Sequence, residues 1–288
     1  MSVITFVNNI DEETGKTMSL VAIATHMAID YNNKILIIST TNKEDKINAC
    51  YFLDKQVKKV RKGLFGENKA TIDTESGIEG IAKIARSNKL RPEIITNYTK
   101  VVFKDRLEIL LGAEKKEKNE ENLEEEEKEI AEEYVDIINI ASMYYDKVFV
   151  DLDDNLNEEI RQKIINRSDL VVVNTSQNYM SLKKLKENKE SNEILKLPKS
   201  LILIGRYDKF SKYNSKNVTK FLEEKNQVLT LPYNTLYFEA TNEAGVPDLF
   251  LKLKKISDSD DRNVHFVEEV KRASENINYR LQELQARR

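Results

Sequence analysis

Residues 1–30 read MSVITFVNNIDEETGKTMSLVAIATHMAID, and they contain three kinds of segment in succession. The β-branched and apolar run VITFV at positions 3–7 predicts a buried strand. A polar turn then leads to Gly15, Lys16 and Thr17, which precede a helical pattern of apolar residues. A phosphate-binding loop has this order, since backbone N–H groups at the helix start hold a phosphate, the lysine adds charge and the hydroxyl reaches Mg²⁺.

The loop carries only the second half of the P-loop motif G-x-x-x-x-G-K-[ST], because Ile10 stands where the first glycine would be. Asp11, Glu12 and Glu13 would repel phosphate oxygens if they turned inward. The alternative is a solvated acidic turn ahead of an ordinary helix. A loop closed by its own carboxylates, or a Lys16 held in an internal ion pair, would favour a scaffold that binds no nucleotide.

Composition excludes several classes of protein. The 288 residues are 40% hydrophobic, enough for a large core in one α/β domain. The net charge of −3 excludes a global field that steers the chain to nucleic acid or an anionic membrane. The single cysteine, Cys50, excludes an internal disulfide, and the distant His26 and His265 make a zinc cluster implausible. With no signal peptide and no run of about 18 apolar residues, we expect a soluble cytoplasmic protein.

Short apolar runs alternate with helical patterns along the chain. This alternation predicts right-handed βαβ units and a three-layer, doubly wound, mostly parallel sheet flanked by helices. Ligands in such sheets bind at the carboxyl ends of the strands, where we expect the Gly15 loop, Asp151 and Arg206 to converge. The expected strands cover 3–7, 34–38, 99–103, 106–111, 147–151, 170–173, 201–204 and 227–231, and the expected later helices 42–62, 76–87, 134–144, 179–188 and 217–225.

Asp151 ends the buried run KVFVD at positions 147–151. An aspartate at the tip of a core strand in P-loop proteins holds the water shell of Mg²⁺, so Asp151 is the candidate Walker B residue. The alternative is an ordinary loop or helix-capping carboxylate, in the company of Asp153 and Asp154.

Three segments stand out by their charge or periodicity. Residues 114–133 hold eleven acidic and four basic side chains, which predicts a solvated, partly helical insertion and a possible docking segment for a basic protein partner. Residues 183–220 hold eleven basic and four acidic side chains and several aromatic ones, which suggests either DNA binding or a solvated set of helices. Residues 263–288 predict a C-terminal helix that packs on the 1–262 domain or in an oligomer, with a membrane anchor less favoured.

The order of segments resembles that of the MinD/ParA family of deviant-Walker (SIMIBI-class) P-loop ATPases over nearly the whole chain. The stretches that carry the resemblance are ETGKTMSLVAIATHMA, YYDKVFVDLDDNL, SDLVVVNTSQNYMSLKKL, LILIGRYDKF and LPYNTLYFEATNEAGVP. The resemblance implies an ATP-bound homodimer that binds a DNA or membrane surface and is released on hydrolysis. It places ATP and Mg²⁺ at Lys16, Thr17 and Asp151, with the first and last of these also catalytic. The other implied nucleotide contacts are Thr14, Gly15, Met18, Arg206 and Pro232.

Several positions depart from the family pattern. The signature lysine that reaches the partner subunit's phosphates would fall at Asp11, and the aspartates after the second strand would fall at Ser39 and Thr41. The Asn-Arg pair of the base-recognition strand is Gly205-Arg206 here. Phosphoryl transfer depends on positioned charge, so these losses predict that nucleotide binds and that hydrolysis is slow or partner-dependent. The alternative is a non-hydrolysing scaffold that acts through protein contacts.

Overall fold

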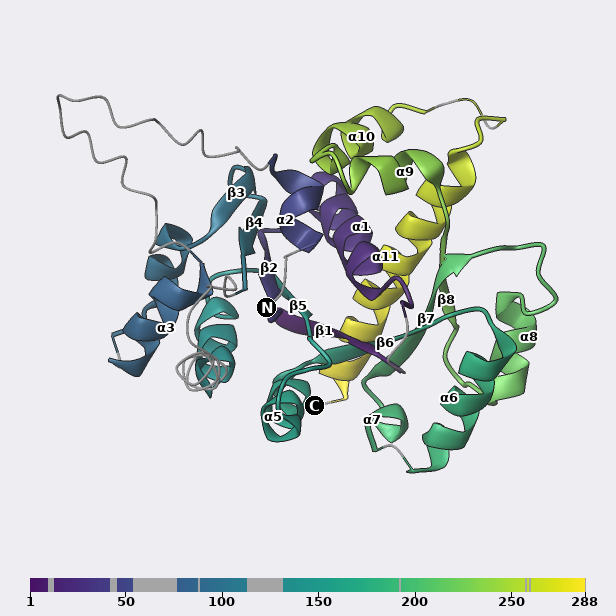
Figure 1. Cartoon of the computed structure of the whole chain (residues 1–288), viewed down its shortest axis with the longest axis horizontal. Helices are drawn as coiled ribbons and strands as arrows, with labels where there is room; N and C mark the ends of the chain where they lie inside the picture. The colour runs from purple at the N-terminus through teal and green to yellow at the C-terminus, as the bar shows by residue number, and fades with distance from the viewer. Residues whose placement is uncertain are drawn as a thin grey trace, which may run out of the picture.

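An eight-stranded sheet forms the centre of the molecule (Figure 1). The structure is a computed structural model, and it describes residues 1–9, 13–41, 46–53, 77–87, 89–112, 132–191, 193–256, 258 and 260–287. The strand order is β3-β4-β2-β5-β1-β6-β7-β8, and only the β3–β4 pair is antiparallel. The strands are β1 (Ser2–Asn8), β2 (Ile35–Ser39), β3 (Lys100–Phe103), β4 (Leu107–Leu110), β5 (Lys147–Asp151), β6 (Leu170–Thr175), β7 (Ser200–Tyr207) and β8 (Leu229–Pro232).

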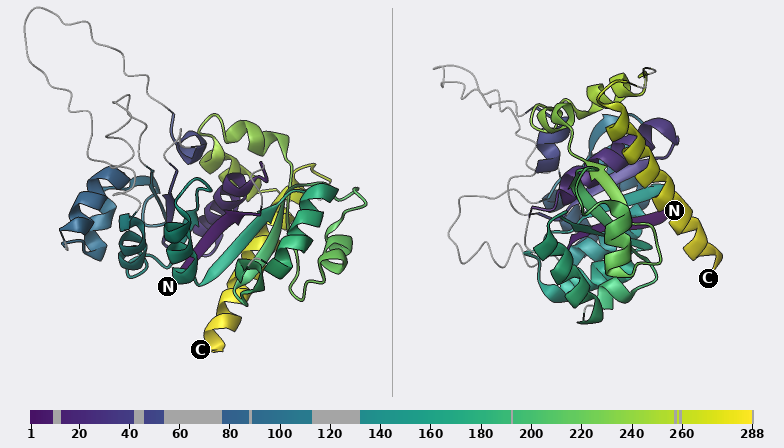
Figure 2. Two further views of the ribbon diagram at one scale, coloured as in Figure 1. Left: turned by 60° about the horizontal axis from the view of Figure 1, so that its bottom comes forward. Right: turned by 90° about the vertical axis from the view of Figure 1, so that its right-hand side faces the viewer.

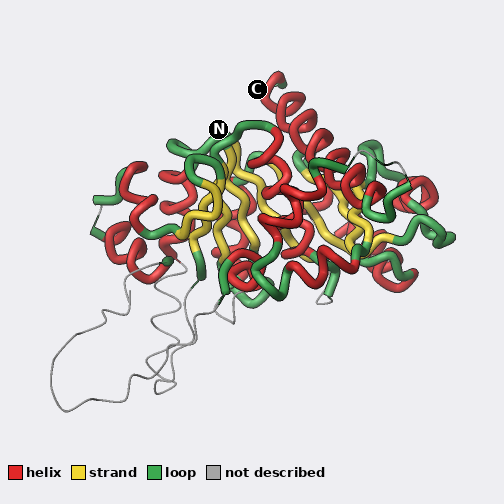
Figure 3. The backbone as a smooth tube through the Cα atoms, turned by 90° about the horizontal axis from the view of Figure 1, so that it is seen from above, coloured by secondary structure: helices red, strands yellow, loops and turns green. Residues whose placement is uncertain are grey.

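Helices cover both faces of the sheet, which gives three layers (Figure 3). One face carries α1 (Lys16–Asp30), α2 (Lys46–Tyr51), α9 (Thr235–Ala240), α10 (Val246–Leu253) and α11 (Val264–Ala286). The opposite face carries α3 (Ile78–Arg86), η1 (Pro92–Asn97), a helix over 132–141, α5 (Glu158–Arg167), α6 (Tyr179–Ser191), α7 (Glu193–Lys196) and α8 (Ser215–Leu222).

The alternation of β1 side chains between the two faces explains this layering. Val3 and Val7 join the hydrophobic core under α5, while Ile4 and Phe6 join the core under α1. All four side chains are at most 3% exposed. A strand buried on both faces has to be apolar at every position, which is why it reads as a continuous apolar run.

The C-terminal helix α11 lies against β8 and α1 along one side of the molecule (Figure 2). Its buried face includes Phe266, Val270, Ile277 and Leu281, all at most 3% exposed. The apolar stripe of α11 is therefore used inside this chain. No helix in the described ranges has an apolar stretch long enough to span a bilayer.

The helix expected over 42–62 is shorter where the structure describes it. Helix α2 ends at Tyr51, and Phe52 and Leu53 are not helical. Ile47, Cys50 and Tyr51 are buried and Phe52 is partly buried against the same core, whereas Leu53 is 74% exposed, so the packing stops just after the helix ends. Residues 42–45 and 54–76 lie outside the described residues, and so does most of the acidic insertion predicted at 114–133.

Candidate phosphate-binding site

Gly15 forms the turn between the loop and α1. Its φ of 81° and ψ of 19° are left-handed, a conformation that glycine adopts without steric strain. Helix α1 starts with the hydrogen bond from Ser19 N to Gly15 O, and no side chain caps its first turn. The first N–H groups of a helix have no partner inside the helix, so those of α1 point toward the loop.

The side chain of Lys16 turns toward the end of β5. Lys16 Nζ lies 3.1 Å from Asp151 Oδ1 and also donates to the carbonyl oxygen of Leu152. The Lys16 and Asp151 side chains are each only 10% exposed. Thr17 Oγ1 donates to Asp151 Oδ2 over 2.7 Å. Three of the residues proposed from sequence, Lys16, Thr17 and Asp151, are therefore in direct contact.

This contact is the internal ion pair of Lys16 that would favour a scaffold. Its partner, however, is Asp151, the residue expected to lie next to Mg²⁺. Asp151 Oδ1 is buried and accepts no hydrogen bond from any described residue, so Lys16 meets it by charge alone. A carboxylate with an unfilled oxygen beside a threonine hydroxyl is a donor set that suits Mg²⁺, which binds oxygen ligands. The residues present fit both Mg²⁺ and a phosphate group.

Glu13, the loop carboxylate that the structure describes, does not turn into the loop. Glu13 Oε2 accepts a hydrogen bond from Arg206 Nη2 over 2.9 Å, and both side chains are more than half exposed. The hydrogen bond from Arg206, helped by the charges of Lys46 and Arg206, lowers the pKa of Glu13. Glu13 thus stays charged and points at Arg206. Asp11 and Glu12 lie outside the described residues.

Arg206 lies next to the loop because β7 runs close to it. A side chain at Gly205 would collide with the carbonyl oxygen of Thr14, so only glycine permits this approach. Arg206 follows with a φ of 51°, in the left-handed region that is uncommon for residues other than glycine. The structure therefore brings Arg206 to Gly15, as predicted. Pro232 ends the edge strand β8, three strands away from β1.

The ends of β2 and β5 are tied together beside the cluster. Thr40 N and Oγ1 donate to Asp151 O, and Thr40 Oγ1 in turn accepts from Asp153 N over 2.8 Å. Burial alone would raise the pKa of Asp153, but hydrogen bonds from Asn155 and Thr41 and the charge of Lys16 outweigh it and lower that pKa. Asp153 is thus a second ionised carboxylate near Lys16.

Ser39 pairs in register with Asp151, and its buried hydroxyl has no partner among the described residues. This position and Thr41 are where the family pattern has aspartates. The described residues at these two positions therefore offer hydroxyl groups where a carboxylate would orient an attacking water.

Sequence reasoning missed the residues that hold the loop and the start of α1. Thr14 Oγ1 donates to Asn8 Oδ1 over 2.5 Å, and Asn8 Nδ2 donates to Asp154 Oδ2. Tyr237 OH in α9 donates to the carbonyl oxygen of Met18 over 2.6 Å. The only local signal was an asparagine at the end of β1, directly before the loop.

Comparisons with known proteins give matches in structure alone. No protein-family model matches the sequence, and no curated protein matches it. The fold is similar to a ParA family ATPase from Chlorobium tepidum TLS, with a TM-score of 0.65 and 14% identity over 95% of this chain and 97% of that one.

Two further solved structures carry nucleotide. A plasmid partition protein from Borrelia burgdorferi bound to AMPPNP has a TM-score of 0.59 and 16% identity, with 98% of both chains covered. The septum site-determining protein MinD from Pyrococcus horikoshii, complexed with Mg-ADP, has a TM-score of 0.56 and 14% identity over 90% of this chain and 96% of that one. The chain therefore has the MinD/ParA-like P-loop NTPase fold.

Proposed function

We propose that this chain is a MinD/ParA-like protein that binds ATP with Mg²⁺, dimerises when it does so, and positions DNA or a membrane-associated machine. One observation carries the proposal: Lys16 and Thr17, at the uncapped start of α1, both contact the Asp151 carboxylate. Lys16 Nζ lies 3.1 Å from Oδ1, and Thr17 Oγ1 lies 2.7 Å from Oδ2. The AMPPNP and Mg-ADP bound to two proteins of the same fold support it.

Nucleotide binding would exchange partners within this cluster. Lys16 would leave Asp151 and turn to the phosphates, while Asp151 and Thr17 would take the Mg²⁺ side. Lys16 would then face the negative phosphates and Asp151 the positive Mg²⁺. Breaking the ion pair would therefore cost less free energy than if one of the two charges were left buried without a counter-charge. Because Mg²⁺ would replace Lys16 as the counter-charge of Asp151, the affinity for ATP should depend strongly on the metal.

Hydrolysis should be slow. The Asp151 side chain remains, but Ser39 and Thr41 offer no carboxylate to orient water. Phosphoryl transfer is catalysed mainly by positioned charges, so losing them should lower the rate by several factors of ten. A partner protein that supplies the missing groups would then control turnover.

Calorimetry tests the binding step. MgATP should give saturable heat with the wild type and none with Lys16→Ala, while ATP with EDTA should bind at least about tenfold more weakly. Lys252→Ala in α10 is a matched control, since it removes an exposed lysine far along the chain from the loop. An absence of heat from wild type and control would leave the scaffold as the function.

A non-hydrolysing scaffold is the second candidate, and the Lys16–Asp151 ion pair favours it. The scaffold should have the same oligomeric state with and without MgATP, whereas the ATP-binding protein should shift from monomer to dimer. Sedimentation velocity with MgATP, with AMPPNP and without nucleotide distinguishes the two candidates.

The basic segment 183–220 is the proposed contact for DNA. Part of its charge is already used: Lys186 lies 3.0 Å from Glu223, Lys189 lies 2.7 Å from Glu224, and Lys199 caps carbonyl groups at the end of α5. Lys209 and Lys212 instead lie over aromatic rings on the surface. Retention on non-specific duplex DNA should fall steeply with salt, and no retention at low salt would exclude DNA as the surface.

A further inference from the structure

The connection between β7 and α8 carries an exposed aromatic ring between two lysines. Residues 208–214 read DKFSKYN, and Phe210 is 86% exposed, more than any other large hydrophobic side chain in the described residues. One exposed apolar side chain is common on protein surfaces, so its surroundings decide whether it has a role. The start of α6 lies beside this connection, on the right of Figure 1. We call residues 177–184 and 208–216 the aromatic-basic surface.

Hydrogen bonds from Gln177 hold the connection in place. Gln177 Nε2 donates to Asp208 O over 2.8 Å and to Tyr213 O over 2.9 Å, and Gln177 Oε1 accepts from Asp208 N over 2.8 Å. Asp208 Oδ1 also accepts from Phe210 N over 2.9 Å. The ring of Phe210 is therefore presented by an anchored turn. A contact that is ordered before binding loses less entropy when a ligand arrives.

The aromatic rings of this surface differ in how they are covered. Tyr179 stacks on Tyr213, with ring centroids 6.1 Å apart, and Lys212 Nζ lies 4.9 Å from the centroid of the Tyr213 ring. Phe210 packs against no other ring in the described part of the chain. Lys209 Nζ lies 5.3 Å from the centroid of the Phe210 ring. Phe210 thus combines an open ring with a cation beside it.

The surface is positively charged. It contains one carboxylate, Asp208, and five exposed lysines: Lys183, Lys184, Lys209, Lys212 and Lys216. Lys183 pairs with Glu187 over 3.6 Å. Between the described residues, no ion pair joins Lys209, Lys212 or Lys216 to a carboxylate. These three charges are available to a polyanion.

The ring at Phe210 indicates which polyanion fits. Lysines alone would favour duplex DNA, because its charge density is higher and its binding releases more counterions. A phenyl ring gains little from a duplex, whose bases are stacked on each other, whereas an unpaired base can stack on it. A bilayer contact uses a wider apolar face, but both sequence neighbours of Phe210, Lys209 and Ser211, are polar.

We propose that the aromatic-basic surface binds single-stranded DNA in preference to duplex DNA. One base stacks on the Phe210 ring, and the flanking phosphates lie next to Lys209 and Lys212. This preference rests on the DNA contact proposed above and adds to it the form of DNA that is bound. Because charge alone predicts the opposite preference, the two contributions can be separated by experiment.

Fluorescence anisotropy with the full chain tests the preference. A labelled oligothymidine of about 20 nucleotides should bind at least about threefold more tightly than a duplex of the same length. Phe210→Ala should weaken binding of the single strand about tenfold and leave the duplex affinity and the salt dependence unchanged. Lys212→Gln should instead lower the salt slope for the single strand by about 0.7. Tyr279→Ala, which removes a 67% exposed ring from α11, is the matched control and should change neither affinity.

Two further probes isolate the stacking contact. An oligonucleotide with abasic spacers keeps every phosphate, so the wild type should bind it as weakly as Phe210→Ala binds oligothymidine. Phe210→Trp keeps an aromatic ring and introduces the only tryptophan of the chain. Its fluorescence should be quenched when oligothymidine stacks on it and should not change with duplex DNA.

Different failures have different meanings. Equal or tighter binding of the duplex by the wild type, or an unchanged single-strand affinity in Phe210→Ala, would overturn this preference and leave the DNA contact in place. Binding of neither form at low salt would overturn the DNA contact as well. A blue shift of Phe210→Trp fluorescence on phosphatidylglycerol vesicles, without quenching by oligothymidine, would assign the surface to a membrane. Tighter binding of the matching oligouridine would assign it to RNA.

Discussion

The two ends of α1 both bury polar groups, but they differ in how those groups are partnered. At its start, Lys16 and Asp151 are buried charges that pair with each other, while Thr17 and a carbonyl group hold the cluster and Asp151 Oδ1 accepts no hydrogen bond from the described residues. At its end, His26 and Tyr31 are buried polar groups that leave one atom each without a partner in the described part of the chain. A ligand at the first end has to exchange existing partners, whereas the unpartnered atoms at the second end are closed off from solvent.

Unpartnered atoms occur at both ends, so the ends differ in the paired charges that only the start of α1 buries. The start of α1 carries the second half of the P-loop motif in a fold shared with two nucleotide-bound solved structures, yet its lysine and aspartate pair with each other. Such a site should be coupled to stability, because substituting one member leaves another buried and alone. The end of α1 should tolerate substitution better, and the following predictions test this contrast.

Asp151→Asn should have the largest effect. It leaves the Lys16 ammonium, 10% exposed, without its counter-charge, so we expect the free energy of unfolding to fall by about 3 kcal/mol. Urea denaturation measures this change. The double variant Lys16→Met, Asp151→Leu removes both charges and should recover most of the stability. Equal stability of Asp151→Asn and wild type would show that water already solvates the ammonium.

Thr17→Val should have a smaller effect at the same end. The isosteric change removes the hydrogen bond to Asp151 Oδ2, which is worth about 1 kcal/mol of unfolding free energy. Thr96→Val, which removes an exposed hydroxyl bonded to a carbonyl in η1, is the matched control and should cost less. A cost for Thr17→Val no greater than that of the control would contradict the closed cluster.

The pH dependence of stability should report on the other end of α1. The pKa of His26 is lowered in the folded chain, so the unfolded chain binds the proton more tightly. Stability should therefore be fully present above the unfolded pKa of about 6.5 and should fall as pH drops from there toward the folded pKa. We expect a modest slope because the Asp30 carboxylate opposes the effect of burial. Urea titrations between these limits should show the slope in His265→Phe and a reduced one in His26→Phe.

Arg206→Ala should have the smallest effect. The ion pair with Glu13 joins two side chains that are more than half exposed, so its loss should change the unfolding free energy by no more than about 0.5 kcal/mol. The same variant tests whether Arg206 contacts a nucleotide: MgATP affinity should fall even though stability does not. Unchanged affinity in calorimetry would remove Arg206 from the site.

Much of the fold could be predicted because the central strands are buried on both faces. Runs such as KVFVD and LVVV are recognisable without any long-range information, and their alternation with helices leads to a parallel sheet. The same logic placed Asp151 at the carboxyl end of a central strand, where the structure has it beside Lys16 and Thr17. The antiparallel strands β3 and β4 lie where two short strands were expected, at 99–103 and 106–111.

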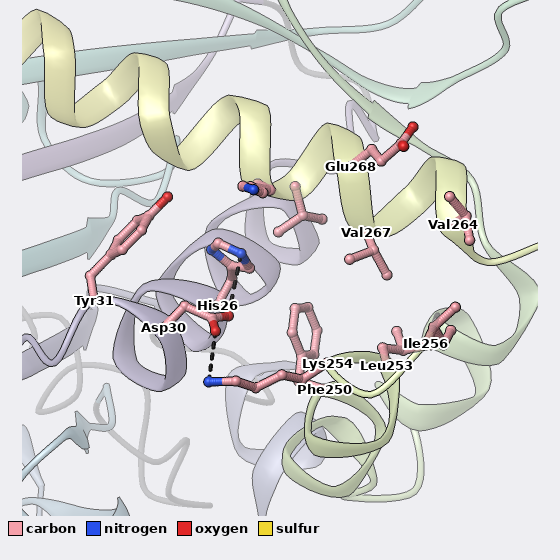
Figure 4. Close-up of a pocket in the computed structure, with 12 residues that line it drawn as sticks. His26, Asp30, Tyr31, Phe250, Leu253, Lys254, Ile256, Val264, Val267 and Glu268 are labelled. Atoms are coloured by element: carbon pink, nitrogen blue, oxygen red, sulfur yellow. Dashed lines mark ion pairs between the residues drawn. The ribbon is translucent and has the colours of Figure 1, made fainter. Parts of the chain in front are cut away.

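What could not be predicted depends on contacts between distant residues. Asn8 meets Asp154 and Tyr237 meets Met18 across 146 and 219 positions, and neither contact has a periodic signature. The cavity between α1, α10 and α11 (Figure 4) was also missed, because it arises where α10 and α11 diverge around the end of α1. His26 looked like an isolated histidine in the sequence, and only packing shows that one of its nitrogens is unpartnered.

Gly205 restricts which substitutions this part of the chain can accept. The family pattern has asparagine at this position, but any side chain here would strike the carbonyl oxygen of Thr14. The backbone of the loop and the absence of a side chain at 205 therefore depend on each other. An asparagine at 205 would be harmful unless the segment around Thr14 moved away. A side chain at 205 would thus require a second, coordinated change around Thr14.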